Sequence, residues 1–128
     1  MSRNTKQKMI VLEALHKLNH PTALEVYEYA KRVYPQISLG TIYRILGNFS
    51  TDEKILHIKI ANNPDHYDFQ THGHYHFSCK KCLNVYDIDI PYMDNLNISH
   101  KEYFIEDHNI LFNGLCANCH QKEGTQHD

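Results

Sequence analysis

The sequence predicts an α+β protein in two parts. Residues 1–71 form an N-terminal winged helix-turn-helix domain, and residues 72–128 form a small C-terminal α/β domain with a structural zinc. Three observations support this division. The apolar spacing is helical in three successive segments and then alternates. All four cysteines and eight of the eleven histidines lie after residue 60. The formal charge is +4 for residues 1–60 and −6 for the remainder, which indicates different partners for the two parts.

Three helices are expected in the first part. Apolar residues recur every three or four positions in three segments, residues 5–19, 23–34 and 39–50. The first stripe includes Met9, the second includes Leu24, and the third consists of Ile42, Ile45, Leu46 and Phe49. Thr22, followed three residues later by Glu25, matches a capping box, and Ser38 is a candidate N-cap for the third helix.

A β-hairpin is expected after the third helix. Residues 56–60 alternate between apolar and polar, residues 62–65 have turn composition, and Tyr67 and Phe69 alternate with polar neighbours. A helix-turn-helix followed by a hairpin is the order of a winged helix. An all-α core with an incidental hairpin remains the alternative.

The second part is expected to mix strands with short helices. Strands are predicted at residues 75–79 and 85–90, a short helix at 91–97, and a closing hairpin from 104–107 and 110–113. Residues 124–128 are expected to be a frayed tail.

The four cysteines form two C-x2-C pairs, Cys79 with Cys82 and Cys116 with Cys119. Two intervening residues allow both thiolates of a pair to bind one ion, and two pairs complete a tetrahedron. The spacing predicts a closed, structural Zn(II) site. Two disulfides or four free buried thiols are the alternatives, and a reducing cytosol disfavours the disulfides.

A second candidate site combines histidines with carboxylates. His74 and His76 are two residues apart on a predicted strand, so they share a face, and Asp87 lies on the next strand. Asp68 and His20 would complete a five-ligand set, although spacing alone does not connect them to the others. Nitrogen and oxygen donors without sulfur suit Fe(II), Mn(II), Zn(II) or Co(II). The alternative is that each histidine is a surface or hydrogen-bonded residue.

The bulk composition narrows the class of protein. No apolar run approaches the roughly 18 residues of a membrane helix, and the N-terminal residues have no apolar core of a signal peptide. We therefore expect a cytoplasmic protein. A basic half suits a DNA backbone, and an acidic, histidine-rich half suits cations.

The motifs resemble those of the ferric uptake regulator family, in order and spacing, from about Thr5 to Lys122. The motifs are His20-Pro-Thr-Ala, Ser38-Leu-Gly-Thr-Ile-Tyr-Arg44, Tyr67-Asp68, His74-Tyr-His76 with Cys79-x-x-Cys82, and Gly114-Leu-Cys116-x-x-Cys119. The resemblance implies a winged helix joined to a dimerisation domain, a homodimer that represses transcription from double-stranded operator DNA, and a regulatory metal. It implies no enzymatic turnover.

Within that family, the candidate ligands resemble the peroxide-sensing branch. Its members have aspartate at the position of Asp87, where iron-sensing members typically have glutamate. The resemblance implies that His20, Asp68, His74, His76 and Asp87 bind regulatory Fe(II) or Mn(II). It also implies that peroxide, the expected small-molecule partner, oxidises His20 and His74 and so releases DNA. Asp94 and His108 would be remnants of a further metal site, or simply solvated residues.

The resemblance also suggests which residues contact DNA. Tyr43 and Arg44 match the groove-facing pair, and the candidate backbone contacts are Ser38, Thr41, Arg3, Lys6 and Lys8. Tyr43 could instead belong to the core, and each lysine could be solvated. Three other functions remain open: an iron-responsive or other metal-uptake regulator of the same family, a non-haem iron enzyme, and a zinc-stabilised protein-interaction module.

Overall fold

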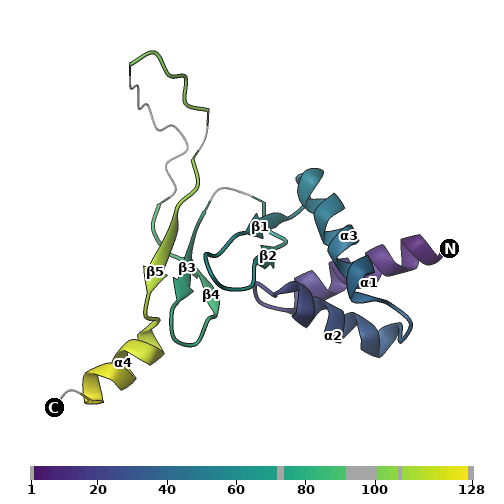
Figure 1. Cartoon of the computed structure of the whole chain (residues 1–128), viewed down its shortest axis with the longest axis horizontal. Coiled ribbons are helices and arrows are strands. Elements are labelled where there is room, and N and C mark those ends of the chain that lie inside the picture. The colour runs from purple at the N-terminus through teal and green to yellow at the C-terminus, as the bar shows by residue number, and fades with distance from the viewer. Residues whose placement is uncertain (1, 72–73, 92–100, 107, 127–128) are drawn as a thin grey trace. The chain divides into compact units, whose positions relative to one another are not determined.

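The structure is a computed structural model that describes residues 2–71, 74–91, 101–106 and 108–126 (Figure 1). Its contacts cluster into two compact units, residues 1–71 and 72–128. The first unit contains three helices and a two-stranded sheet, and the second contains a three-stranded sheet and one helix. The predicted α+β class is therefore confirmed.

The first unit has the predicted order of elements. Its helices are α1 (Arg3–Lys17), α2 (Ala23–Val33) and α3 (Leu39–Thr51), and its strands are β1 (Leu56–Ile58) and β2 (His66–Asp68). The two strands pair antiparallel, with Leu56 opposite Asp68 and Ile58 opposite His66. The hairpin therefore follows the three helices directly, which is the arrangement expected of a wing.

Side-chain caps explain where the helices begin. Thr22 and Glu25 form the predicted capping box, in which the Glu25 N–H donates to the Thr22 hydroxyl and the Thr22 N–H donates to the Glu25 carboxylate. Ser38 caps α3 as predicted, because its hydroxyl accepts from the Thr41 N–H at 3.1 Å. These caps satisfy backbone donors that have no partner within the helix.

The core of the first unit is formed by one face of each helix. The predicted stripe of α3 is confirmed, because Ile42, Ile45, Leu46 and Phe49 are all buried. The predicted faces of the other two helices are partly wrong, because Met9 and Leu24 are each 53% exposed. On α2 the predicted Ala30 is buried, together with Val26, which was expected to flank the face, and Ala23. Small alanine side chains allow helices to pack closely. The spacing of the large apolar residues alone does not predict this packing.

The second unit is built around a central strand. The elements are β3 (Tyr75–Cys79), β4 (Val85–Ile88), β5 (Leu111–Gly114) and α4 (Ala117–Gln126), and the strand order is β4-β3-β5. Strand β4 pairs antiparallel with β3, so the strands predicted at 75–79 and 85–90 are confirmed, although β4 ends at Ile88. Strand β5 pairs with β3 in parallel.

That parallel pairing contradicts the predicted closing hairpin. Residues 104–106 are in no strand, residue 107 lies outside the described residues, and β5 pairs instead with the distant β3. Helix α4 reaches Gln126, where a frayed tail was expected from Gly124. In the predicted helix at 91–97, Pro91 is not helical, and 92–97 lie outside the described residues. Among the helices that are described, none has the length and hydropathy required to cross a membrane.

We predict that Ile45→Ala lowers the free energy of unfolding by about 2–5 kcal/mol, because Ile45 is fully buried and truncation leaves a cavity. Val33→Ala is the matched control, since Val33 is 58% exposed, and it should change stability by less than about 0.5 kcal/mol. Urea denaturation at constant zinc would measure both. Equal effects of the two variants would contradict the packing described.

Candidate metal centres

The four cysteines converge in the second unit. Their sulfur atoms all lie within 4.8 Å of one another. None is in a disulfide; Cys79 and Cys119 are buried and Cys82 is exposed. The disulfide alternative is therefore not supported.

The backbone around the cysteines holds the sulfurs in place. Cys79 is the last residue of β3, and its sulfur accepts from the backbone N–H groups of Cys82 at 3.5 Å and Cys116 at 3.4 Å. Leu83, with φ 65°, turns the chain back into β4, and the Lys80 N–H donates to the Gly114 carbonyl at 2.7 Å. The two pairs are thus joined by the β3–β4 turn and by the contact between β3 and β5.

The distances fit a tetrahedral zinc site. Zinc–sulfur bonds of about 2.3 Å in a tetrahedron place the sulfurs about 3.8 Å apart. The sulfurs of Cys82 and Cys116 are 3.9 Å apart, whereas a disulfide would require about 2.05 Å. Four sulfur donors leave no open position for substrate, so the site fits a structural role.

The pKa values of the buried thiols are shifted in opposite directions. Burial raises the pKa of Cys79, but backbone N–H donors from Cys116 and Cys82 outweigh it and lower the pKa to about 6. The pKa of Cys119 is raised to about 12, first by its hydrogen bond with the Cys116 sulfur. Four neighbouring thiolates repel one another, and a divalent cation removes that repulsion.

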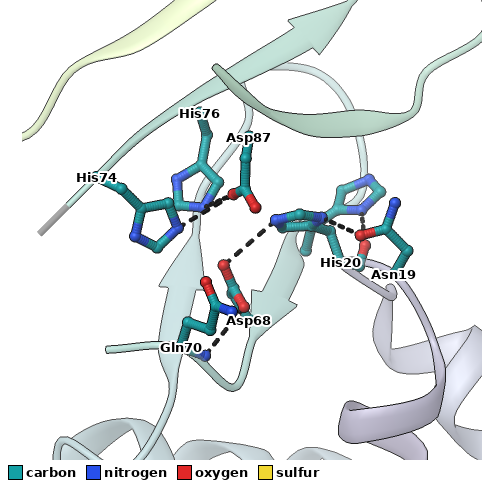
Figure 2. Close-up of polar contacts among 8 residues, drawn as sticks. Asn19, His20, Asp68, Gln70, His74, His76 and Asp87 are labelled. Carbon is teal, nitrogen blue, oxygen red and sulfur yellow. Dashed lines mark hydrogen bonds and ion pairs between the residues drawn. The ribbon is translucent and has the colours of Figure 1, made fainter. Parts of the chain in front are cut away.

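The histidine–carboxylate residues of the second unit lie together on β3, on β4 and at the residue that precedes β3. His76 is directly opposite Asp87. His74 lies two residues before His76, so the two histidine side chains are on the same side. Asp87 Oδ1 lies 3.1 Å from His74 Nε2 and 3.5 Å from His76 Nε2 (Figure 2). His76 is buried, whereas the Asp87 side chain is 52% exposed.

A histidine–carboxylate pair lies within the first unit. His20 Nε2 and Asp68 Oδ2 are 3.2 Å apart, and both residues are buried (Figure 2). Asp68 Oδ1 accepts from the Gln70 N–H at 3.0 Å, which orients the carboxylate. Of the five residues in the predicted nitrogen–oxygen set, the first unit therefore holds two in contact and the second unit holds three.

The donor chemistry of both groups fits a divalent cation. Ligand bonds of about 2.1 Å at right angles place neighbouring donor atoms about 3.0 Å apart. The observed distances between nitrogen and oxygen are 3.1–3.5 Å. Imidazole and carboxylate without sulfur suit Fe(II) or Mn(II) as well as zinc.

Two residues beside His20 are absent from the sequence prediction. The Asn19 side-chain oxygen lies 2.7 Å from His20 Nδ1, and His66 Nδ1 lies 2.5 Å from the His20 carbonyl oxygen. His66 is two residues before Asp68 on β2, so alternation along the strand was a signal available in the sequence. No comparable signal identifies Asn19.

Of the two expected remnants of a further metal site, the structure describes only His108. His108 Nε2 is 2.9 Å from the Tyr75 hydroxyl, so His108 packs against β3 through this hydrogen bond. Asp94 lies outside the described residues.

The candidate DNA-contacting residues lie mainly on the surface of the first unit. Tyr43 is 55% exposed, so it is not part of the core, and Arg44 beside it is also exposed. Arg3 and Lys6 are exposed and Lys8 is half-buried on α1. The Ser38 hydroxyl caps α3 and lies 2.9 Å from the Thr41 hydroxyl, so both hydroxyls already have protein partners.

The profile of the ferric uptake regulator family matches residues 1–113. The peroxide-responsive repressor PerR of Staphylococcus saprophyticus is 31% identical over 124 residues, which cover 94% of this chain and 84% of that protein. The protein of the same name from Staphylococcus epidermidis is 30% identical over 127 residues, covering 96% and 84%.

Solved structures share the fold. The Campylobacter jejuni peroxide stress regulator superposes with a TM-score of 0.73 at 24% identity, covering 91% of each chain. The Helicobacter pylori ferric uptake regulator superposes with a TM-score of 0.77 at 19% identity, covering 91% of this chain and 84% of that one.

We predict that Cys119→Ser abolishes zinc retention and unfolds the sheet of the second unit, because the binding free energy of a structural zinc is also folding free energy. Metal analysis and far-ultraviolet circular dichroism would measure the two effects. Asn113→Ser is the matched control, since this exposed β5 residue contributes no sulfur, and it should keep its zinc. Stoichiometric zinc in Cys119→Ser would contradict a four-sulfur site.

Proposed function

Since the chain belongs to the ferric uptake regulator family, we propose that it is a metal-dependent repressor that binds operator DNA as a homodimer and releases it on exposure to hydrogen peroxide. The observation that carries the proposal is the contact of Asp87 with both His74 and His76. This group offers two nitrogens and a carboxylate, with no sulfur, to a redox-active cation. The names of the Staphylococcus relatives support the peroxide signal.

We propose a regulatory site with five ligands: His20, Asp68, His74, His76 and Asp87. The pair in the first unit and the trio in the second have compatible chemistry, and neither fills a coordination shell by itself. One ion that takes ligands from both units would complete the shell. Fe(II) is the ion proposed for sensing, and Mn(II) would support DNA binding with little response to peroxide.

An ion shared in this way would control DNA binding through geometry. It would fix the angle between the two units of a chain. In a two-fold dimer, that angle sets the distance between the two recognition helices, which must match the spacing of the half-sites. Metal would therefore select one of two global states.

The proposed response to peroxide modifies the ligands themselves. A bound Fe(II) would supply the redox chemistry that activates hydrogen peroxide at the site. In the net reaction, a ring carbon of His20 or His74 loses two electrons, the O–O bond breaks, one oxygen is added to the ring and the other leaves as water. The oxidised ring is a poorer ligand than imidazole, so the shell loses a donor. The change is stoichiometric and involves no turnover.

The proposed DNA-reading surface is the exposed face of α3. Tyr43 and Arg44 lie on the side of α3 opposite the buried residues Ile42, Ile45 and Leu46. An arginine can read guanine in the major groove, and a tyrosine can contact a thymine methyl group or a phosphate. Exposed Arg3 and Lys6 on α1 are the proposed phosphate contacts.

We predict that peroxide dissociates the complex of operator DNA with Fe(II)-loaded protein and leaves the Mn(II) complex intact. Mobility shifts would follow the complex, and mass spectrometry should find one added oxygen on the peptides that contain His20 and His74. The peptide that contains His57 is an internal control, because His57 pairs with Asp65 away from the proposed ligands. An intact Fe(II) complex without added oxygen would indicate an iron-responsive regulator instead.

We predict that Arg44→Ala weakens operator binding by about 1–3 kcal/mol, roughly 5- to 160-fold, because a bidentate contact with a base is lost. Tyr43→Ala should have a smaller effect in the same direction. Arg32→Ala is the matched control, since it removes the same exposed charge from the end of α2. Fluorescence anisotropy at fixed salt would measure all three. Equal losses in the two arginine variants would argue for nonspecific electrostatics.

A further inference from the structure

The backbone at His20 adopts an unusual conformation. Its φ of 47° lies in the left-handed region, which residues with a side chain rarely occupy outside turns. The residue is nevertheless buried, with only 7% of its surface exposed. Contacts on both sides of His20 must therefore maintain this conformation.

Strand β2 supplies the contacts on one side. His66 Nδ1–H donates to the His20 carbonyl, and the Tyr67 N–H donates to the Pro21 carbonyl at 2.8 Å. Thr22 and His66 also form an antiparallel bridge. The segment that carries His20 is thus attached to β2, the same strand that carries Asp68.

Asn19 supplies the contact on the other side. Its side-chain oxygen lies 2.7 Å from His20 Nδ1, as Figure 2 shows. An amide oxygen only accepts, so Nδ1 must carry a proton in this hydrogen bond. The other ring nitrogen, Nε2, points to Asp68 at 3.2 Å.

We propose that Asn19 is a positioning residue for His20, whose hydrogen bond keeps the proton on Nδ1 so that Nε2 is the nitrogen that binds the regulatory cation. The inference rests on the proposed function in taking His20 as a ligand. A neutral imidazole has one protonated nitrogen and one lone pair, so fixing the proton on Nδ1 assigns the lone pair to Nε2. Partners of this kind orient the ring and make it a better ligand.

The first test reads the ring nitrogens directly. Protein with zinc in both sites is diamagnetic, so nitrogen-15 NMR of labelled histidines can identify the metal-bound nitrogen of His20. We expect Nε2 to bind the metal and the Nδ1 proton to exchange slowly with water. Asn19→Leu, which has similar size and no acceptor, should make that exchange fast. Asn19→Asp, which keeps an acceptor, should restore the slow exchange.

The second test measures affinity for Mn(II) by competition with a fluorescent chelator. We expect Asn19→Leu to weaken binding at the regulatory site by about tenfold, the lower end for loss of such a partner. Asn63→Leu, which removes an amide from the wing turn, is the matched control and should bind like the wild type. Asn19 is exposed, and the contacts of His20, Pro21 and Thr22 with β2 do not involve it, so its replacement should leave folding and the structural zinc unchanged.

The outcomes separate the inference from the proposed function. Metal binding through Nδ1, or unchanged exchange and affinity in Asn19→Leu, would overturn the role of Asn19. The Mn(II) affinity of His20→Ala tests the proposed function separately. If His20→Ala binds Mn(II) as tightly as the wild type, then His20 is no ligand and the proposed five-ligand site fails, whatever the Asn19 variants show.

Discussion

The arrangement of the second unit depends on the pairing of β3 with β4. The turn between Cys79 and Asn84 is closed by hydrogen bonds of the backbone and of the Cys79 sulfur. That closure fixes the antiparallel register, and the register places Asp87 opposite His76. A slip by one residue would move every side chain of one strand to the other face. The cysteine turn therefore positions the carboxylate as well as the sulfurs.

The first unit brings a histidine and a carboxylate together through contacts of its own backbone. Its histidine and carboxylate come from a loop and a strand that are distant in sequence, and they meet because the backbone of Pro21 and Thr22 pairs with β2. The Gln70 N–H then orients Asp68. Contacts within the first unit therefore bring the two donors together.

Features set by neighbouring residues were predictable from the sequence. The caps at Thr22 and Ser38, the two strands on either side of the cysteine turn and the proximity of His74, His76 and Asp87 all follow from short-range spacing. The parallel pairing of β5 with β3 was not predictable, because its partner lies more than thirty residues away and no alternation marks the strand. Leu24 was misplaced because the smaller Ala23 and Val26 are buried on α2, and Met9 is exposed although Leu15 of the same predicted stripe is buried. Spacing alone did not link His20 with Asp68.

Strand β3 carries His76 and Cys79 three residues apart, and this has a consequence for assembly in the cell. A newly made chain without zinc would lack the sulfur cluster that joins β3, its turn and the segment after β5. The histidines beside it would then have no fixed carboxylate opposite them. With zinc bound by the four cysteines and the regulatory site formed as proposed, metal loading would be ordered, with zinc first and the regulatory cation second. Under the proposed function, zinc starvation would then prevent DNA binding irrespective of the supply of the second metal.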